Sequence, residues 1–276
     1  MRIIVTGASS YISRYIIDMI LIEGHEVLGI SRTKPSIEHP RFFFKECNLV
    51  ENIPIVDGKW DIIIHMAAHS LLNEKASEYF NVNLLLTNNI RKLALRVLPD
   101  VILYASSFKV YGEIRDKVLT ENSDRINSCL YGTTKYYGEQ LLQEVAPTVS
   151  LRMPGVLGKG SHGWIDKIHK SLLINEKITL SSSAYNHIVH AYDVATVFIK
   201  IIAKKYYEDE QYNICSSGIS TSLEVVEFMK KELGSDSEIV VSDNTDNGFI
   251  FSNKKLCSIH SPMTVLDSIK LYLSEF

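Results

Sequence analysis

The chain has 276 residues, of which 46% are hydrophobic and 22% are charged, and its formal net charge is -3. This composition is that of a globular protein, and the length allows one large domain or a domain with a smaller lobe. The near-neutral balance of charge gives no electrostatic basis for binding nucleic acid or an anionic membrane surface.

Several sequence features bear on compartment. No apolar run approaches the roughly 20 residues that span a bilayer, and a strand-like run follows Met1 directly, without the apolar segment of a signal peptide. The four cysteines are scattered and form no C-x-x-C pair, which disfavours a disulfide framework or a zinc site. We therefore expect a cytoplasmic protein with reduced thiols and no metal, nucleic-acid or membrane partner.

The first elements predict a parallel sheet. Residues 2–6 form a short β-branched run typical of a buried strand, and an amphipathic helix is expected over residues 11–23, with Gly24 as its C-cap glycine. Residues 26–30 read as the next strand, so the chain opens with a βαβ unit. The turn after its first strand is where a dinucleotide pyrophosphate meets N–H groups at a helix N-terminus.

That turn departs from a glycine-rich pattern. A G-x-x-G-x-x-G spacing would place glycines at Gly7, Ser10 and Ser13, and two of these are serine. A serine hydroxyl can donate to phosphate, but it cannot replace a glycine that needs positive φ or very close helix packing. An ordinary strand–turn–helix remains an alternative interpretation here.

The residues after the second strand bear on the choice of dinucleotide. An NAD site commonly places an acidic residue there for the ribose 2′-hydroxyl. Ser31 and Arg32 offer a hydroxyl and a guanidinium instead, which suit a 2′-phosphate. We therefore expect NADP(H) in preference to NAD(H). The alternative is an arginine on an exposed loop.

Further strands are predicted over residues 42–47, 60–65, 101–105 and 148–152, and a long helix over residues 79–98. Small residues that allow a ligand near the backbone follow the fourth strand, at 66–68. His65 and His69 there predict no metal site, because no acidic partner accompanies them. The fifth strand delivers Ser106 and Ser107 to the carboxyl edge of the sheet, where open α/β folds bind ligands.

Tyr131 and Lys135 are four residues apart, so they lie on one face of the helix expected there. An ammonium beside a phenol favours the phenolate and lowers the tyrosine pKa from its usual value of about 10. Such a pair can exchange a proton with a sugar or alcohol oxygen near neutral pH. A serine hydroxyl from a strand end could hydrogen-bond the same oxygen. Taken alone, the same spacing also arises by chance on exposed helices.

Ordered landmarks run along almost the whole chain, at residues 6–12, 65–68, 83, 105–112, 131–135, 152–154, 188–195 and 212–214. With these landmarks the chain resembles the extended short-chain dehydrogenase/reductase family, in its NAD-dependent epimerase/dehydratase branch, which mostly acts on nucleotide sugars. The resemblance implies an α/β Rossmann-type doubly wound parallel sheet over 1–153 and about 185–215. It implies a small C-terminal substrate-binding lobe over about 154–184 and 216–276.

The resemblance also implies residue roles. Tyr131 is the acid/base, Lys135 orients the nicotinamide ribose, and Ser107 bridges Tyr131 and the reacting oxygen. The expected cofactor-binding residues are Gly7, Ser9, Ser10, Tyr11, Ile12, Ser31, Arg32, Asn48, Leu49, Met66, Ala67, Ala68, Asn83, Ala105, Ser106, Tyr131, Lys135, Pro154 and Val156. The expected substrate contacts are His69, Ser107, Phe108, Lys109, Trp164 and His187.

Two departures from the family pattern bear on the reaction. Phe108 and Lys109 stand where sugar dehydratases of the family carry an Asp-Glu pair, so we do not expect 4,6-dehydration. His187 stands where an arginine often holds the substrate diphosphate. Another cation, Lys109, Lys159 or Lys167, would have to replace it, or the substrate is not a nucleotide sugar.

Together these features predict an NADPH-dependent ketoreductase of a nucleotide-linked sugar, a 4-keto-6-deoxy intermediate in the leading interpretation. The alternatives are a nucleotide-sugar 4-epimerase with tightly bound NAD, a reductase of a small carbonyl without a nucleotide, and a non-catalytic dinucleotide-binding protein. A homodimer is expected through the helix at 79–98 and the helix of Tyr131. Its candidate residues, Leu84, Leu85, Ile90, Tyr136 and Tyr137, could equally belong to the core.

Overall fold

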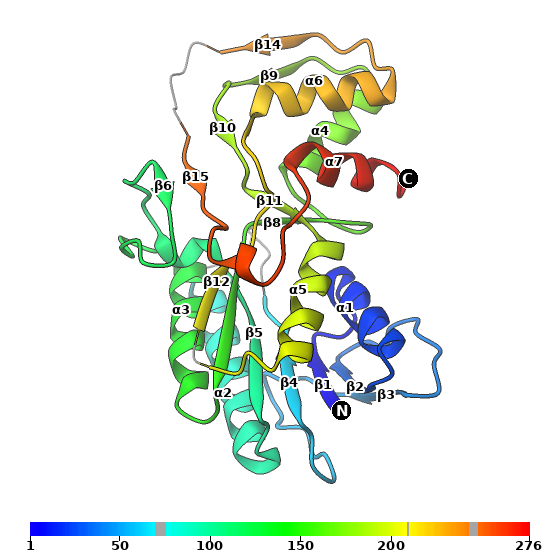
Figure 1. The fold of residues 1–276 in the computed structure, drawn as a ribbon, viewed down its shortest axis with the longest axis vertical. Helices are drawn as coiled ribbons and strands as arrows, with labels where there is room; N and C mark the ends of the chain where they lie inside the picture. The colour runs from blue at the N-terminus through cyan, green and yellow to red at the C-terminus, as the bar shows by residue number, and fades with distance from the viewer. Residues whose placement is uncertain (70–75, 209, 243–247) are drawn as a thin grey trace. The chain divides into compact units, whose positions relative to one another are not determined.

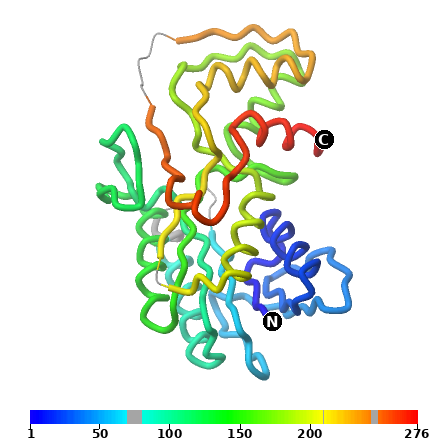
Figure 2. The backbone as a smooth tube through the Cα atoms, in the orientation of Figure 1, coloured from blue at the N-terminus to red at the C-terminus, as the bar shows by residue number. Residues whose placement is uncertain are grey.

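The computed structural model describes residues 1–69, 76–208, 210–242 and 248–276. The chain forms two compact units. The first comprises Met1–Glu113, Asp124–Arg152 and Ala195–Tyr212, and the second comprises Ile114–Ser123, Met153–Val194 and Asn213–Phe276. The colours of the backbone in Figure 2 show that each unit combines stretches that are distant in the sequence.

A seven-stranded sheet in the order β12-β7-β5-β4-β1-β2-β3 forms the centre of the first unit. Its strands are β1 (Arg2–Thr6), β2 (Glu26–Ser31), β3 (Phe42–Glu46), β4 (Ile62–His65), β5 (Val101–Ser107), β7 (Thr148–Met153) and β12 (Glu210–Asn213). The pairs β1–β2, β2–β3, β1–β4 and β4–β5 are parallel. The order runs outward in both directions from β1 and β4, which confirms the doubly wound Rossmann-type fold.

Helices cover both faces of this sheet, with α2 (Ala76–Val97) and α3 (Leu130–Gln143) on one side and α1 (Tyr11–Ile22) and α5 (Ala191–Lys204) on the other (Figure 1). Strand residues such as Ile4, Ile63 and Ile102 share one buried cluster with apolar residues of α2 and α3. Their neighbours along the strands point to the opposite face and are equally buried. Burial on both faces explains the β-branched runs in the sequence.

The first helix ends as the sequence predicts. Gly24 follows the C-cap residue Glu23 with a φ of +84°, a conformation that L-residues other than glycine rarely adopt. Its N–H donates to the carbonyl of Leu21, and that of His25 donates to the carbonyl of Ile20. The glycine thus turns the chain directly into β2.

Some elements differ from the predicted ranges. β4 begins at Ile62 rather than at residue 60, and the indole N–H of Trp60 donates to the carbonyl of Asp57 at 3.2 Å. The long helix begins at Ala76 rather than at residue 79. Residues 185–194, expected in the Rossmann domain, lie in the second unit, where β11 (Ile188–His190) pairs with β8 (Gly155–Leu157).

The second unit is built from short strand pairs and helices. Its further strands are β6 (Val118–Leu119), β9 (Ile178–Leu180), β10 (Ala184–Tyr185), β13 (Ser220–Thr221), β14 (Ile239–Val241) and β15 (Ile250–Phe251). Its helices α4 (Trp164–Leu173), α6 (Ser222–Leu233) and α7 (Val265–Leu273) share an apolar core with β8, β9 and β11. No helix in the described ranges of either unit is long and apolar enough to cross a membrane.

Candidate active site

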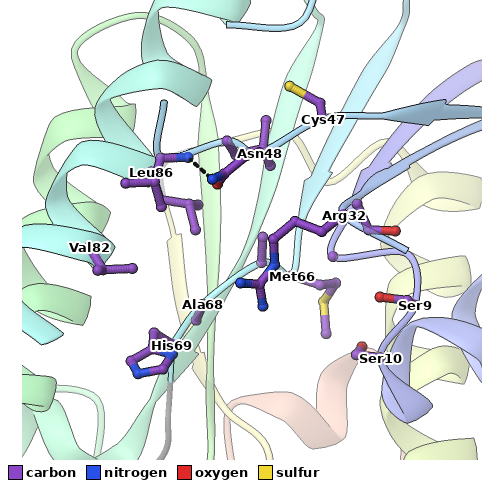
Figure 3. Close-up of a pocket in the computed structure, with 15 residues that line it drawn as sticks. Ser9, Ser10, Arg32, Cys47, Asn48, Met66, Ala68, His69, Val82 and Leu86 are labelled. Carbon is purple, nitrogen blue, oxygen red and sulfur yellow. Dashed lines mark hydrogen bonds between the residues drawn. The ribbon is translucent and has the colours of Figure 1, made fainter. Parts of the chain in front are cut away.

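A pocket of about 220 Å³ lies in the first unit at the carboxyl ends of β1 to β4 (Figure 3). From the adjacent strands β1 and β4 the chain continues to α1 and α2, which lie on opposite faces of the sheet (Figure 1). Open parallel sheets bind ligands at the carboxyl edge where the chain separates in this way. The lining residues are Gly7, Ser9, Ser10, Ser31, Arg32, Cys47, Asn48, Leu49, Val50, Met66, Ala67, Ala68, His69, Val82 and Leu86. Most of the predicted cofactor-binding residues are therefore brought together.

The turn after β1 keeps the one glycine that its geometry demands. Gly7 has a φ of +66°, and a Cβ there would lie 2.8 Å from the backbone nitrogen of Ala67. Ser10 has an ordinary φ of -74°, and its Oγ caps α1 by accepting from the N–H of Ser13 at 3.1 Å. The Ser13 hydroxyl donates to the Gly7 carbonyl at 2.9 Å. The two serines thus close the turn with their own side chains.

Ser31 and Arg32 both line the pocket, but they differ in exposure. The Ser31 hydroxyl is buried and donates to the carbonyl of Thr33 at 2.7 Å, so its only proton is already engaged. The Arg32 side chain is exposed and points into the pocket (Figure 3). A phosphate in the pocket would find its charge-assisted donor in Arg32 rather than in Ser31.

Several predicted cofactor residues lie outside the pocket lining. Asn83 in α2 accepts from the N–H of His69 at 2.8 Å and donates to its carbonyl at 3.1 Å. It also donates to the Thr134 hydroxyl, so this side chain fastens a pocket loop to α3. Tyr11 and Ile12 begin α1, and Pro154 and Val156 belong to the second unit.

The sequence did not indicate Cys47, Val50, Val82 and Leu86, which also line the pocket. Val82 and Leu86 are spaced four residues apart on α2, and that spacing is equally typical of core packing. The spacing alone therefore does not distinguish a pocket wall from a helix face that packs in the core.

Two glycines bring α3 against the end of β5. A Cβ at Gly132 would lie 2.0 Å from the carbonyl oxygen of Lys109 in the short helix η1 (Phe108–Tyr111). A Cβ at Gly138 would lie 2.4 Å from the hydroxyl of Tyr104 in β5. The backbone of α3 therefore lies against the backbone of η1 and the Tyr104 side chain of β5, which places Tyr131 beside the turn that follows Ser107.

Lys135 is 3% exposed, and its ammonium donates to the carbonyl of Ala105 at 2.8 Å. Burial lowers the pKa of Lys135 to about 7. Burial raises the pKa of the half-buried Tyr131 to about 12, and the Lys135 ammonium lies 5.9 Å from its ring centroid. The predicted lowering of the Tyr131 pKa is therefore wrong for the protein without ligands, because the ammonium is directed at Ala105 and desolvation dominates.

The two serines at the end of β5 have separate partners. The Ser106 hydroxyl donates to the carboxylate of Glu139 at 2.5 Å, which makes this residue part of the support of the site. The Ser107 oxygen accepts from the N–H of Lys109 at 3.2 Å, so its proton can be offered to a ligand oxygen. This arrangement fits the role predicted for Ser107.

The predicted substrate residues are distributed over both units. His69 lines the pocket, and Phe108 and Lys109 lie in η1, where the Lys109 ammonium is 4.8 Å from the Phe108 ring centroid. In the second unit, Trp164 packs against Tyr185 with ring centroids 5.1 Å apart.

His187, also in the second unit, cannot supply the missing positive charge. Burial lowers the pKa of His187, so the imidazole is neutral at physiological pH. Its Nε2 donates to the carbonyl of Phe249 at 2.6 Å, and the two rings stack with centroids 3.9 Å apart. The structure therefore gives His187 a packing role rather than that of an arginine substitute.

Comparison with known proteins agrees with this geometry. A family model described as "NAD dependent epimerase/dehydratase family" matches residues 3–215. A UDP-glucose 4-epimerase from Caenorhabditis elegans is 28% identical over 172 residues, which cover 52% of this chain and 49% of that protein. The matched part thus spans about half the length of that relative.

Two further proteins are similar over larger shares of their length. A dTDP-4-dehydrorhamnose reductase from Aggregatibacter actinomycetemcomitans is 22% identical over 209 residues, which cover 74% of this chain and 68% of that protein. The crystal structure of a UDP-glucuronic acid 4-epimerase from Bacillus cereus in complex with NAD superposes with a TM-score of 0.85 at 20% identity. That superposition covers 100% of this chain and 96% of the other, which supports the same fold.

Substituting Gly132 tests the backbone contact of α3. We expect Gly132→Ala to push the first turn of α3 away from η1, because the Lys109 carbonyl cannot yield, and to lower stability by about 1–3 kcal/mol. Displacing Tyr131 by about 1 Å should reduce turnover by about 100-fold. Chemical denaturation and steady-state kinetics measure the two effects, with the exposed position Gln140→Ala in the same helix as control. Normal turnover by Gly132→Ala would contradict the contact.

Lys135→Met tests the cost of the buried charge. Since the Lys135 pKa is lower in the folded than in the unfolded chain, folding must release its proton or bury the charge. We expect the variant to be more stable by about 1–3 kcal/mol at pH 7 and below, with the gain declining as pH rises from 7 toward 10.

Denaturant melts at pH 6 and pH 9 measure this difference. Lys92→Met on the exposed face of α2 should change stability by less than about 0.5 kcal/mol at either pH. A loss of stability in Lys135→Met would show that the ammonium supports the fold.

Proposed function

Because the chain belongs to the NAD dependent epimerase/dehydratase family, we propose that it is an NADPH-dependent ketoreductase of a nucleotide-linked sugar, of the 4-keto-6-deoxy class. The observation that carries the proposal is the bond from the Lys135 ammonium to the Ala105 carbonyl, which ties the helix of Tyr131 to the strand that ends at Ser107. Phe108 and Lys109 follow Ser107 directly, in place of the Asp-Glu pair that the sugar dehydratases of the family carry, which argues against a dehydration.

The pocket residues fit a nicotinamide dinucleotide. Gly7 brings the turn after β1 within van der Waals distance of the backbone at Ala67, and the N-terminus of α1 offers its N–H groups to a pyrophosphate. Arg32 would hold a 2′-phosphate, and Leu49 and Met66 give the pocket apolar walls. When bound, the nicotinamide supplies the hydride for reduction of a carbonyl carbon.

The chain's own residues supply the proton and the placement. Burial keeps Tyr131 protonated at neutral pH, and that is the state a donor to a carbonyl oxygen needs. The Ser107 hydroxyl can donate to the same oxygen and fix its position. The positive charge of Lys135 stabilises the phenolate that remains after Tyr131 has given up its proton.

A second candidate, nucleotide-sugar 4-epimerase, is favoured by the names of similar proteins, among them the enzymes from Caenorhabditis elegans and Bacillus cereus. The reductase from Aggregatibacter actinomycetemcomitans supports the first candidate. Arg32 in the pocket lining supports the first candidate, because a guanidinium there would favour an exchangeable NADPH over a retained NAD. A small carbonyl substrate, or a non-catalytic role, follows if no nucleotide sugar reacts.

We infer a homodimer only from the family resemblance. The exposure of the candidate residues reduces the number that could form its interface. Ile90 is fully buried in the core between α2 and the sheet, so of the two alternatives for this residue the structure selects the core. Leu85 and Tyr137 are 49% and 53% exposed and remain available to a second copy.

Absorbance of the reduced nicotinamide tests the reaction. With a panel of nucleotide-linked 4-keto sugars we expect loss of the NADPH signal, and Tyr131→Phe should lower turnover by about 100- to 10,000-fold while NADPH binding persists. An altered sugar without consumption of NADPH would identify an epimerase instead. Normal turnover by Tyr131→Phe would refute the assigned acid.

Arg32→Ala tests cofactor choice. Loss of a charge-assisted contact to the 2′-phosphate, worth about 1.5–3 kcal/mol, should weaken NADPH binding by about 10- to 150-fold and leave NADH binding nearly unchanged. Fluorescence titration with both nucleotides measures this. Lys34→Ala, which removes an exposed cation two residues away, should affect neither nucleotide. Equal weakening for NADPH and NADH would exclude a 2′-phosphate contact.

A further inference from the structure

A buried ion pair lies behind the catalytic pair in the first unit. Glu139 in α3 and Arg152 in β7 are 0% and 1% exposed. The guanidinium donates from Nε to Oε1 at 2.9 Å and from Nη2 to Oε2 at 2.7 Å. Its Nη1 donates to the hydroxyl of Tyr111 at 2.9 Å. This two-pronged contact holds the Glu139 carboxylate in one orientation.

Stability alone is a poor reason to keep such a pair. Replacing a buried ion pair by apolar side chains of similar size is often neutral or stabilising, because desolvation offsets most of the attraction. Glu139 lies four residues beyond Lys135 and eight beyond Tyr131, so all three share one face of α3. The position of the carboxylate therefore indicates a role in the candidate active site rather than in stability.

Lys135 has one anionic neighbour among the described groups that face it. These groups are Glu139 and Tyr131 on α3, Tyr104 on β5, whose ring centroid is 4.9 Å from the ammonium, and His65 on β4. Burial raises the pKa of Tyr104 and lowers that of His65, so both are neutral. The pKa of Lys135 is lowered by burial, and the Glu139 carboxylate opposes this effect.

The same carboxylate holds the end of β5. Ser106 is 3% exposed and donates its hydroxyl proton to Glu139 Oε1. Ser107 is the next residue along the strand and accepts from the N–H of Lys109 at the start of η1. Fixing Ser106 thereby fixes the backbone that carries the Ser107 hydroxyl.

We propose that Glu139 is a positioning residue for the reaction, whose buried carboxylate, one turn beyond Lys135 on α3, favours the ammonium form of Lys135 and, through Ser106, holds Ser107 in place. Arg152 orients this carboxylate and balances its charge. Glu139 acts through these neighbours and does not itself touch the substrate. The inference deepens the proposed function, but its main test needs neither substrate nor cofactor.

The test follows the titration of Lys135 directly, by NMR of protein labelled at lysine Cε, with Lys135→Met identifying the resonance. We expect Glu139→Gln to lower the Lys135 pKa by about 1–3 units, because the variant removes the anion and leaves the Arg152 charge unbalanced. A Lys135 titration unchanged in Glu139→Gln would overturn the proposal.

Glu144→Gln provides the matched control. Glu144 ends the same helix and also pairs with an arginine, Arg91 at 3.1 Å, but its side chain is 58% exposed. Its removal should leave the Lys135 titration unchanged. An equal shift in both variants would mean that general charge, rather than the buried contact, sets the Lys135 pKa.

A second variant guards against misfolding. Glu139→Met with Arg152→Met replaces the pair by apolar side chains, which should fold and still lower the Lys135 pKa. In the active enzyme, the basic limb of kcat/KM against pH should move to lower pH in Glu139→Gln, a change that a purely structural role would not produce. Absence of any turnover in the unaltered protein would refute the proposed function and leave the NMR result to decide on Glu139.

Discussion

The bond from the Lys135 ammonium to the Ala105 carbonyl determines how the first unit places its reactive groups. It joins α3, which carries Tyr131, to the carboxyl end of β5, which ends at Ser107. Because water cannot solvate an ammonium buried at this point, the protein must supply a hydrogen-bond acceptor in a fixed position. The glycines at 132 and 138 allow that geometry, because they let the helix backbone approach the backbone of η1 and the side chain of Tyr104. The position of the buried Lys135 ammonium therefore depends on the close packing of α3.

The pocket at the carboxyl ends of β1 to β4 belongs to the same sheet, but hydrogen bonds of uncharged groups shape it rather than a buried charge. Its turn depends on a single glycine, Gly7, while Ser10 and Ser13 satisfy the remaining hydrogen bonds with side chains. The loss of two glycines therefore costs no backbone strain, since Ser10 keeps an ordinary φ. A family pattern can thus weaken in sequence while the turn that it describes persists in space.

Much of the fold could be predicted from the sequence because strands and helices follow local rules. The continuous apolar runs of the buried strands, the capping glycine Gly24 and the four-residue spacing of Tyr131 and Lys135 are all encoded within short segments. The pKa of Tyr131 could not be predicted, because it depends on desolvation and on where a distant carbonyl draws the ammonium. The contact of Ser106 with Glu139 likewise joins residues 33 positions apart.

The Asn83 amide links parts of the molecule that have separate tasks. It holds both backbone groups of His69 in the pocket loop and donates to Thr134, whose hydroxyl in turn donates to the carbonyl of Tyr131. His69 and the first turn of α3 are thus joined through one side chain before any ligand binds. For Tyr131, the acid that we propose, this linkage means that little binding energy would be spent on ordering its helix.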